Sequence, residues 1–331
     1  MENNSSLRVR KRQLLLCTGL LGISLCISSC HKPDIELVEQ PVFETDTTGD
    51  HIGVRTFITY NIYKDQLYPY TTYSIKPEIL ATIKDKNVVT AELNLWNSRQ
   101  KDKQSHEKIF RLFSDLIPEM YRKDIKYFSV SVPSPTYATM STLKNNSLES
   151  FNLEVNAELL TYLDSIPAFK APEYRHNTLG YSYPIYLLIH EFGHYVTSNK
   201  EQSYLKYLPN SNTYNAAPKP GSIQDSLDVM YWNRYLKDQA GVDCWAKHGN
   251  TYYFCEPANE FVTGYASSSL GEDAAETFAH FVLLDEKPTA TTAVNRKLLL
   301  FYQNPRMVAI RQSIRENLKK LGIVPRSPTM R

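Results

Sequence analysis

The chain has 331 residues, 42% of them hydrophobic, so it is long and apolar enough for one large domain or two small domains with a real core. The formal net charge of +2 is close to zero and argues against a nucleic-acid partner, because domains that bind nucleic acids are usually strongly basic. Residues 1–29 carry four of the 37 basic residues and one of the 35 acidic residues, so the rest of the chain holds 33 basic against 34 acidic residues, a net charge of −1.

The first thirty residues have the pattern of an export signal. A basic segment at residues 8–12 precedes an apolar run at residues 14–27, which is too short to span a membrane. The run ends in the sequence ISSC, which resembles a bacterial lipobox and makes Cys30 the residue that is lipidated and begins the mature chain. We therefore expect a lipoprotein signal peptide at residues 1–29 and an exported protein that is lipid-anchored to a bacterial outer membrane, on its periplasmic or surface face. An ordinary secretory signal with an incidental cysteine is the alternative, and it also exports the chain.

Residues 30–182 predict a tether followed by an α/β part that matches no motif. Residues 30–50 are polar and acidic without a helical or strand period, which indicates a tether between the anchor and the folded chain. Further along, β-branched and aromatic residues indicate strands, and apolar residues at helical spacing indicate helices. The predicted elements are a strand at 54–63, a helix at 76–84, an amphipathic helix at 104–121 that Pro118 ends or kinks, a strand at 125–132, a loop at 133–150 that can cover the site, and a helix at 153–163.

Residues 183–198 predict a helix that carries an HExxH motif, HEFGH at residues 190–194. Residues four apart lie on one face of a helix, so His190 and His194 can bind the same tetrahedral Zn²⁺. Glu191 stands beside the first histidine and can accept a proton from a water molecule on the metal. A surface helix with two solvated histidines is the alternative, but the flanking positions are apolar at helical spacing, as a buried active-site helix requires.

The segment between this helix and the next motif is an insertion without repeats. Residues 200–214 are polar and rich in tyrosine, residues 218–221 indicate a turn, and residues 222–237 predict a helix. The insertion can contact a substrate or serve only for packing, and both readings are open. Its aromatic residues Tyr231, Trp232 and Tyr235 are predicted to lie in the core.

Two cysteines, Cys244 and Cys255, remain after the signal peptide and the anchor position are set aside. They are eleven residues apart in a chain that we expect to be exported to a compartment that permits disulfides, so a bridge between them is predicted. Two buried free thiols are the alternative. Neither cysteine is a candidate zinc ligand, because the chain has no CxxC pair.

Residues 261–284 contain the candidate third ligand, Glu272. Ser269 precedes an apolar, alanine-rich run and predicts the start of a helix. Glu272 stands three residues later, so it either completes a capping box with Ser269 or binds the metal. The three-histidine extension of HExxH is excluded, because it needs glycine at Thr197 and histidine at Lys200.

The same predicted helix carries a second carboxylate, Glu276, one turn after Glu272. It can accept a hydrogen bond from the outer nitrogen of a zinc histidine and so orient that ligand. Asp273 is rotated by about 100° from Glu272 and is expected to face elsewhere. Residues 292–321 predict one or two amphipathic helices, broken near Pro305, that belong to the scaffold.

HEFGH, followed by Tyr265, Glu272 and Glu276, resembles the lethal-factor-like catalytic domain of the gluzincins. The segment T-x-Y-A…E-D-x-A-E is also similar to zinc-binding metallopeptidase lipoproteins of Gram-negative bacteria. The resemblance covers residues 183–284 and implies an α+β, zincin-like domain over residues 51–331, with a small mixed sheet, the HExxH helix and a downstream ligand helix; the N-terminal α/β part, about 51–150, stays unassigned. It further implies one Zn²⁺ bound by His190, His194 and Glu272, with Glu191 as the general base and Tyr265 as a hydrogen-bond donor to the oxyanion. The alternative is that Tyr265 is one of the 23 tyrosines of the chain and has no catalytic role.

The expected function is therefore zinc-dependent hydrolysis of peptide bonds in a peptide or protein substrate, by a protein anchored outside the cytoplasm. An alternative is a catalytically silent lipoprotein with a zincin fold that binds peptides or partners. A third reading is a hydrolase of non-peptide amides. Substrate specificity is left open by the sequence.

Overall fold

The computed structural model describes residues 56–72, 94, 98–131, 137–142, 148–156, 159, 179–209 and 213–324. The chain divides into two compact units, Met1–Pro41 and Val42–Arg331, and every described residue belongs to the second. The predicted signal peptide, Cys30, the acidic tether and the predicted helix at 76–84 lie outside the described residues.

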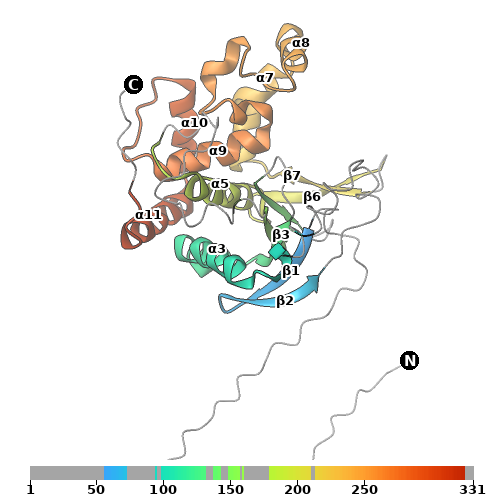
Figure 1. The fold of residues 1–331 in the computed structure, drawn as a ribbon. Coiled ribbons are helices and arrows are strands. Elements are labelled where there is room, and N and C mark those ends of the chain that lie inside the picture. Colours follow the sequence, from blue (N-terminus) through green and yellow to red (C-terminus); the bar gives the residue numbers. More distant parts are fainter. Residues whose placement is uncertain are drawn as a thin grey trace, which may run out of the picture. The chain divides into compact units, whose positions relative to one another are not determined.

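A five-stranded mixed sheet with the strand order β2-β1-β3-β5-β4 is one half of the fold (Figure 1). Its strands are β1 (Thr56–Tyr63), β2 (Gln66–Thr72), β3 (Ile125–Ser131), β4 (Ala138–Thr142) and β5 (Phe151–Asn156). β3 and β5 pair in parallel, and the other neighbours are antiparallel. β5 has buried residues on both faces, as expected of a strand with neighbours on both sides and helices packed nearby.

Two strands correct the sequence-based prediction. β4 occupies the middle of residues 133–150, which were predicted to be a loop, and β5 occupies the start of the predicted helix at 153–163. The sequence FNLEVN of β5 alternates apolar and polar residues, which is the strand period, and pairing with β3 and β4 stabilises the extended chain. β4 lies at the edge of the sheet and contacts α5, so it belongs to the scaffold of the site.

The helices of the other half lie close to the positions predicted from the sequence. α5 (Tyr183–Ser198) packs against α9 (Leu270–Leu283) (Figure 1) and also contacts β4. The ring centroids of Phe113 in α3 and Phe192 in α5 are 6.5 Å apart, so α3 packs on the same core. The remaining helices of this group are α3 (Lys103–Leu116), the short η1 (Glu119–Tyr121) that follows Pro118, α10 (Ala293–Tyr302) and α11 (Pro305–Lys320). The described residues therefore form an α+β fold with a mixed sheet.

The insertion after α5 begins with a β-hairpin that the sequence analysis missed. It is formed by β6 (Ser203–Leu208) and β7 (Thr213–Pro218). The predicted helix at 222–237 is confirmed as a continuous helical run that starts after Ser222, whose hydroxyl accepts a hydrogen bond from a first-turn amide. The run and the elements after it are α6 (Ile223–Leu227), the π-helical η3 (Asp228–Trp232), α7 (Asn233–Tyr235), α8 (Gln239–Lys247), η4 (Glu256–Glu260) and η5 (Tyr265–Ser268).

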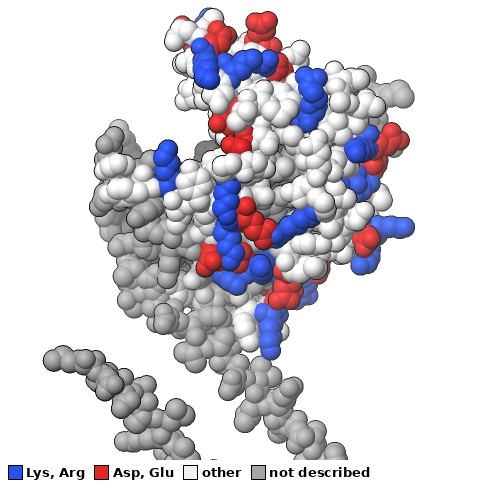
Figure 2. Space-filling view, turned by 180° about the vertical axis from the view of Figure 1, so that it is seen from behind, with Lys and Arg blue, Asp and Glu red and all other residues white. Residues whose placement is uncertain are grey.

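The surface of the described part is mixed in charge. On the face shown in Figure 2, Lys and Arg side chains are interspersed with Asp and Glu side chains. Among the described residues, no helix combines the length and the apolar character that crossing a bilayer requires. The aromatic residues of the insertion, Tyr231, Trp232 and Tyr235, are buried as predicted.

Candidate metal centre

The centre is built where α5 and α9 approach each other closely. A Cβ atom at Gly193 would lie 3.0 Å from the Cα and the carbonyl oxygen of Ala275, so a glycine is needed in α5 at this crossing. α9 begins after Ser269, whose hydroxyl accepts a hydrogen bond from the Glu272 amide at 3.1 Å. The serine half of the predicted capping box is therefore present, whereas the Glu272 carboxylate lies at the histidines of α5.

Three predicted metal ligands lie together. The Nε2 atoms of His190 and His194 are 3.1 Å apart, and the Glu272 Oε2 atom is 3.2 Å from the first and 3.3 Å from the second. His190 is buried, and the side chains of His194 and Glu272 are each 21% exposed, so one side of the group is open to small molecules. The described residues thus contain a His190–His194–Glu272 group that could hold a metal ion.

The spacing of these atoms fits a tetrahedral zinc ion. Bonds of about 2.0–2.1 Å in a tetrahedral arrangement place neighbouring ligand atoms about 3.3 Å apart. The three distances of 3.1, 3.2 and 3.3 Å agree with that value. Two imidazole nitrogens and one carboxylate oxygen also form a ligand set of catalytic zinc, in which one coordination position is left for water or substrate.

The charges around the centre favour a cation between its ligands. Burial disfavours the charged form of His190, but hydrogen bonds with Glu272 and Glu276 outweigh it and raise the pKa of the imidazole to about 10. Burial also disfavours the charged form of Glu272, but hydrogen bonds with His190 and His194 outweigh it and hold the pKa of its carboxyl well below the usual range. The site therefore stabilises positive charge at the position where a metal would bind.

Glu191 lies on the same helix, with its carboxylate almost fully buried. Burial raises its pKa, partly opposed by the positive charge on the neighbouring histidines. Its carboxylate hydrogen-bonds the backbone of Met140 in β4, and its Oε2 atom has no hydrogen-bond partner among the described residues. One oxygen is thus fixed by the edge strand and the other is available to a water molecule.

Glu276 makes the contact predicted for it. Its Oε1 atom lies 2.7 Å from Nδ1 of His190, the ring nitrogen that faces away from the ligand group. Its Oε2 atom accepts a hydrogen bond from the hydroxyl of Tyr186 at 2.8 Å. Sequence reasoning missed Tyr186, although it precedes His190 by four residues and the helical period places both on one face.

Tyr265 is placed beside the ligands by η5. Its ring centroid is 5.9 Å from that of His190, and the residue is 45% exposed. Burial of its hydroxyl and the Glu272 carboxylate, to which the hydroxyl is hydrogen-bonded, raise the pKa of Tyr265. The phenol therefore stays protonated and can donate a hydrogen bond at the open side of the centre.

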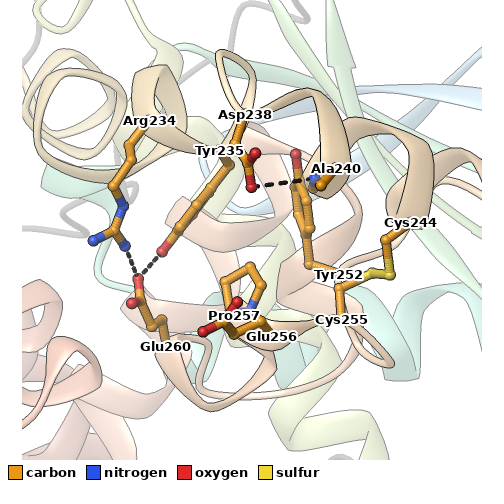
Figure 3. A pocket seen from close by; sticks show the side chains of 11 residues that line it. Arg234, Tyr235, Asp238, Ala240, Cys244, Tyr252, Cys255, Glu256, Pro257 and Glu260 are labelled. Atoms are coloured by element: carbon orange, nitrogen blue, oxygen red, sulfur yellow. Dashed lines mark hydrogen bonds and ion pairs between the residues drawn. A yellow bond between two sulfur atoms is a disulfide. The ribbon is translucent and has the colours of Figure 1, made fainter.

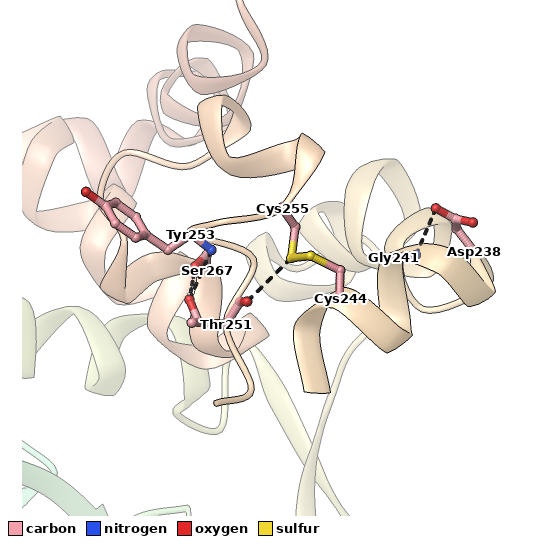
Figure 4. Close-up of a disulfide and its surroundings, with 7 residues drawn as sticks. All are labelled: Asp238, Gly241, Cys244, Thr251, Tyr253, Cys255 and Ser267. Atoms are coloured by element: carbon pink, nitrogen blue, oxygen red, sulfur yellow. Dashed lines mark hydrogen bonds between the residues drawn. A yellow bond between two sulfur atoms is a disulfide. The ribbon is translucent and has the colours of Figure 1, made fainter. Parts of the chain in front are cut away.

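Cys244 and Cys255 form the predicted disulfide (Figure 4). Both cysteines also line a pocket of about 350 Å³ in which Glu260 accepts hydrogen bonds from Arg234 and Tyr235 (Figure 3). The predicted catalytic and metal-binding residues are not part of this pocket's lining, which consists of Arg234, Tyr235, Asp238, Ala240, Gly241, Cys244, Tyr252, Cys255, Glu256, Pro257 and Glu260.

Comparison with known proteins does not assign the chain to a family. It matches no protein-family model, and it has no match among curated proteins or among solved structures. The function of the chain is therefore inferred from the HExxH motif and the geometry of the candidate metal centre.

Proposed function

We propose that the protein is a zinc-dependent peptidase of the gluzincin type, with a zincin-like catalytic domain. The observation that carries the proposal is the near-equilateral arrangement of the His190, His194 and Glu272 ligand atoms, 3.1 to 3.3 Å apart, with the buried Glu191 on the same helix as the two histidines. When bound there, Zn²⁺ acidifies a water molecule and polarises the carbonyl of the scissile bond.

The residues around the ligands supply the proton transfer, the stabilisation of the oxyanion and the orientation of a ligand. Glu191 accepts the proton of the attacking water and later delivers it to the leaving amine; its pKa, raised by burial, makes it a stronger base than a solvated carboxylate. Tyr265 donates its phenolic hydrogen bond to the oxyanion that forms on the substrate. Glu276 holds the His190 imidazole in one orientation through Nδ1 and leaves Nε2 for the metal.

The first experiment compares the wild-type chain with Glu191→Gln. Glutamine has nearly the same shape but cannot act as a base, so we expect zinc content to be unchanged and cleavage of a broad peptide library to fall by at least about 100-fold. Zinc is measured by atomic absorption on the purified mature chain, and cleavage by mass spectrometry with and without a chelator. Full activity in Glu191→Gln contradicts the mechanism.

The same experiment separates the peptidase from a silent binding protein. A wild-type chain that binds zinc but cleaves no peptide of the library supports capture of peptides or partners instead of hydrolysis. Cleavage that stops on chelation and returns with added Zn²⁺ supports the peptidase. A library of acylated amines tests the hydrolysis of non-peptide amides.

We propose further that the protein is exported and held on a bacterial outer membrane through a lipid on Cys30. The support is the basic segment, the apolar run and the ISSC sequence at the start of the chain. Expression of the full chain with labelled palmitate tests this, with Cys30→Ser as the control. Label in the wild-type chain and none in the variant is the expected result, and equal labelling of both contradicts it.

A further inference from the structure

The hydroxyl of Thr263 connects two parts of the centre that have different functions. Thr263 is 8% exposed and lies in the loop before η5. Its Oγ1 atom donates a hydrogen bond to the Glu276 Oε2 atom at 2.5 Å and accepts one from the Ala266 amide at 3.0 Å. A hydroxyl can donate once and accept at the same time, so both bonds form together.

On one side, this hydroxyl fixes the carboxylate that orients a metal ligand. The Glu276 Oε2 atom accepts two hydrogen bonds, from Tyr186 at 2.8 Å and from Thr263 at 2.5 Å. Its Oε1 atom is left for Nδ1 of His190 at 2.7 Å. With both oxygens engaged and the side chain buried, the carboxylate is restricted in rotation, and so is the imidazole that it holds.

On the other side, the same hydroxyl fixes the turn that carries Tyr265. The Ala266 amide directly follows Tyr265 in the chain, and the Ser267 hydroxyl donates to the Gly264 carbonyl at 2.7 Å. The Ser267 hydroxyl also contacts the Thr251 hydroxyl at 2.5 Å (Figure 4). The turn is thereby held from within and from the disulfide-bonded segment, but Thr263 alone ties it to Glu276 among the hydrogen bonds found for the described residues.

We propose that Thr263 is a positioning residue that sets, with one hydroxyl, the orientation of the His190 imidazole and the position of the Tyr265 phenol. The half that concerns His190 rests only on metal binding at the centre. The half that concerns Tyr265 rests on the proposed peptidase function. Two different measurements can therefore test the two halves separately.

The test compares Thr263→Val with Thr263→Ser. Valine keeps the shape of threonine and removes the hydroxyl, whereas serine keeps the hydroxyl. Zinc affinity is measured on the purified mature chain by competition with a chromophoric chelator, without any substrate. We expect Thr263→Val to raise the zinc Kd by about 10- to 100-fold and Thr263→Ser to stay within about threefold of the wild type. If valine does not allow folding, judged by circular dichroism, Thr263→Ala takes its place.

Tyr186→Phe is the matched control for the second half. It removes the other donor to Glu276. No hydrogen bond found for the described residues joins Tyr186 to the turn of Tyr265, so this variant should weaken zinc binding and lower kcat at saturating zinc less than Thr263→Val does. Thr263→Val should lower kcat by about tenfold under the same conditions with little change in KM, because the Tyr265 bond forms only in the transition state.

The outcomes separate this inference from the proposed function. Equal zinc affinity in Thr263→Val and the wild type overturns the role in orienting His190, whatever the activity. If Thr263→Val binds zinc more weakly than the wild type and the wild type cleaves no peptide, the role in orienting His190 is supported and the proposed peptidase function is overturned. If Thr263→Val and Tyr186→Phe have the same kcat at saturating zinc, the role in placing Tyr265 is wrong.

Discussion

The ammonium nitrogen of Lys297 lies 2.6 Å from the carboxylate of Asp273, and neither side chain has any exposed surface. Asp273 also accepts a hydrogen bond from the Trp232 indole at 2.9 Å, and Lys297 lies 4.0 Å from the centre of the Phe261 ring. The pair joins the first turn of α9 to α10 and to η3, and Asp273 directly follows the proposed metal ligand Glu272 in the chain. As predicted, Asp273 faces away from the metal centre.

Removing one partner of this pair should cost more than removing both. Lys297→Met leaves a buried, unpaired carboxylate and should lower the free energy of unfolding by about 3–5 kcal/mol. The double variant Lys297→Met/Asp273→Asn should regain most of that loss, because no uncompensated charge remains. Urea unfolding followed by circular dichroism measures both. A double variant as unstable as the single one would show that the pair is net stabilising.

Metal binding should stabilise the folded chain by a free energy that grows with the logarithm of the ratio of zinc concentration to Kd. Zinc at 100 times its Kd adds about 2.7 kcal/mol to the free energy of unfolding. We expect His190→Ala and Glu272→Ala to abolish the rise in melting temperature on adding Zn²⁺, and Glu191→Gln to retain it. Differential scanning calorimetry with and without zinc provides the measurement. A zinc-dependent rise in Glu272→Ala equal to that of the wild type would exclude Glu272 as a ligand.

Gly193→Ala should push α5 and α9 apart. The added Cβ would lie 3.0 Å from the Ala275 main chain and 3.1 Å from the Phe278 ring. The overpacking should outweigh the gain in helix propensity and lower the free energy of unfolding by about 1–2 kcal/mol. Gly271→Ala is the control, since its Cβ would meet only the Ser269 hydroxyl at 3.8 Å, and it should be neutral or stabilising. Thermal melts of both variants test the contrast.

His106 should make the fold less stable in mild acid. Its Nδ1 atom forms a hydrogen bond of 2.6 Å with the Tyr60 hydroxyl, and burial lowers the pKa of the imidazole from 6.5 to about 4. Between these values the unfolded chain binds a proton that the folded chain does not, so stability falls as pH falls from 6.5 to 4. The full loss is about 3 kcal/mol.

The substitution His106→Gln isolates this effect. Glutamine keeps a hydrogen-bonding side chain but does not titrate, so the difference in unfolding free energy between variant and wild type should change by about 3 kcal/mol across that pH range. Urea unfolding at pH 7.5, 5.5 and 4 gives the comparison. A constant difference would show that the pKa of His106 is the same in the folded and the unfolded chain.

The disulfide should stabilise both the insertion and the turn of Tyr265. The bridge joins two cysteines that are eleven residues apart. The double variant Cys244→Ala/Cys255→Ala removes it and should lower the free energy of unfolding by about 2–3 kcal/mol. Thr251 and Tyr252, between the cysteines, both bond Ser267 in η5. We therefore expect kcat to fall in the variant while zinc affinity is unchanged. A fall in zinc affinity as large as the fall in kcat would contradict this separation.

The helices that form the candidate metal centre could be predicted because the sequence signals for them are local. The helical period and the caps at Ser222 and Ser269 lie within a few residues of the helices that they define, and the HExxH motif places two candidate metal ligands about one turn apart. β5 was predicted wrongly although FNLEVN has the strand period, because an alternation this short does not by itself decide between strand and helix, and the pairing with β3 and β4 that decides it is set by the whole sheet. Thr263 was missed for the same kind of reason: its contact with Glu276 spans thirteen residues and exists only once α9 is in place.

The close approach at Gly193 also bears on how proteins of this kind can be found. The second variable position of HExxH is not free here, because any side chain would meet the main chain of Ala275 and not merely another side chain. A search pattern that leaves both variable positions open will therefore collect chains whose second helix lies farther from the first. Requiring glycine there, together with two glutamates four residues apart downstream, selects helix pairs at this spacing, even where overall sequence similarity has disappeared.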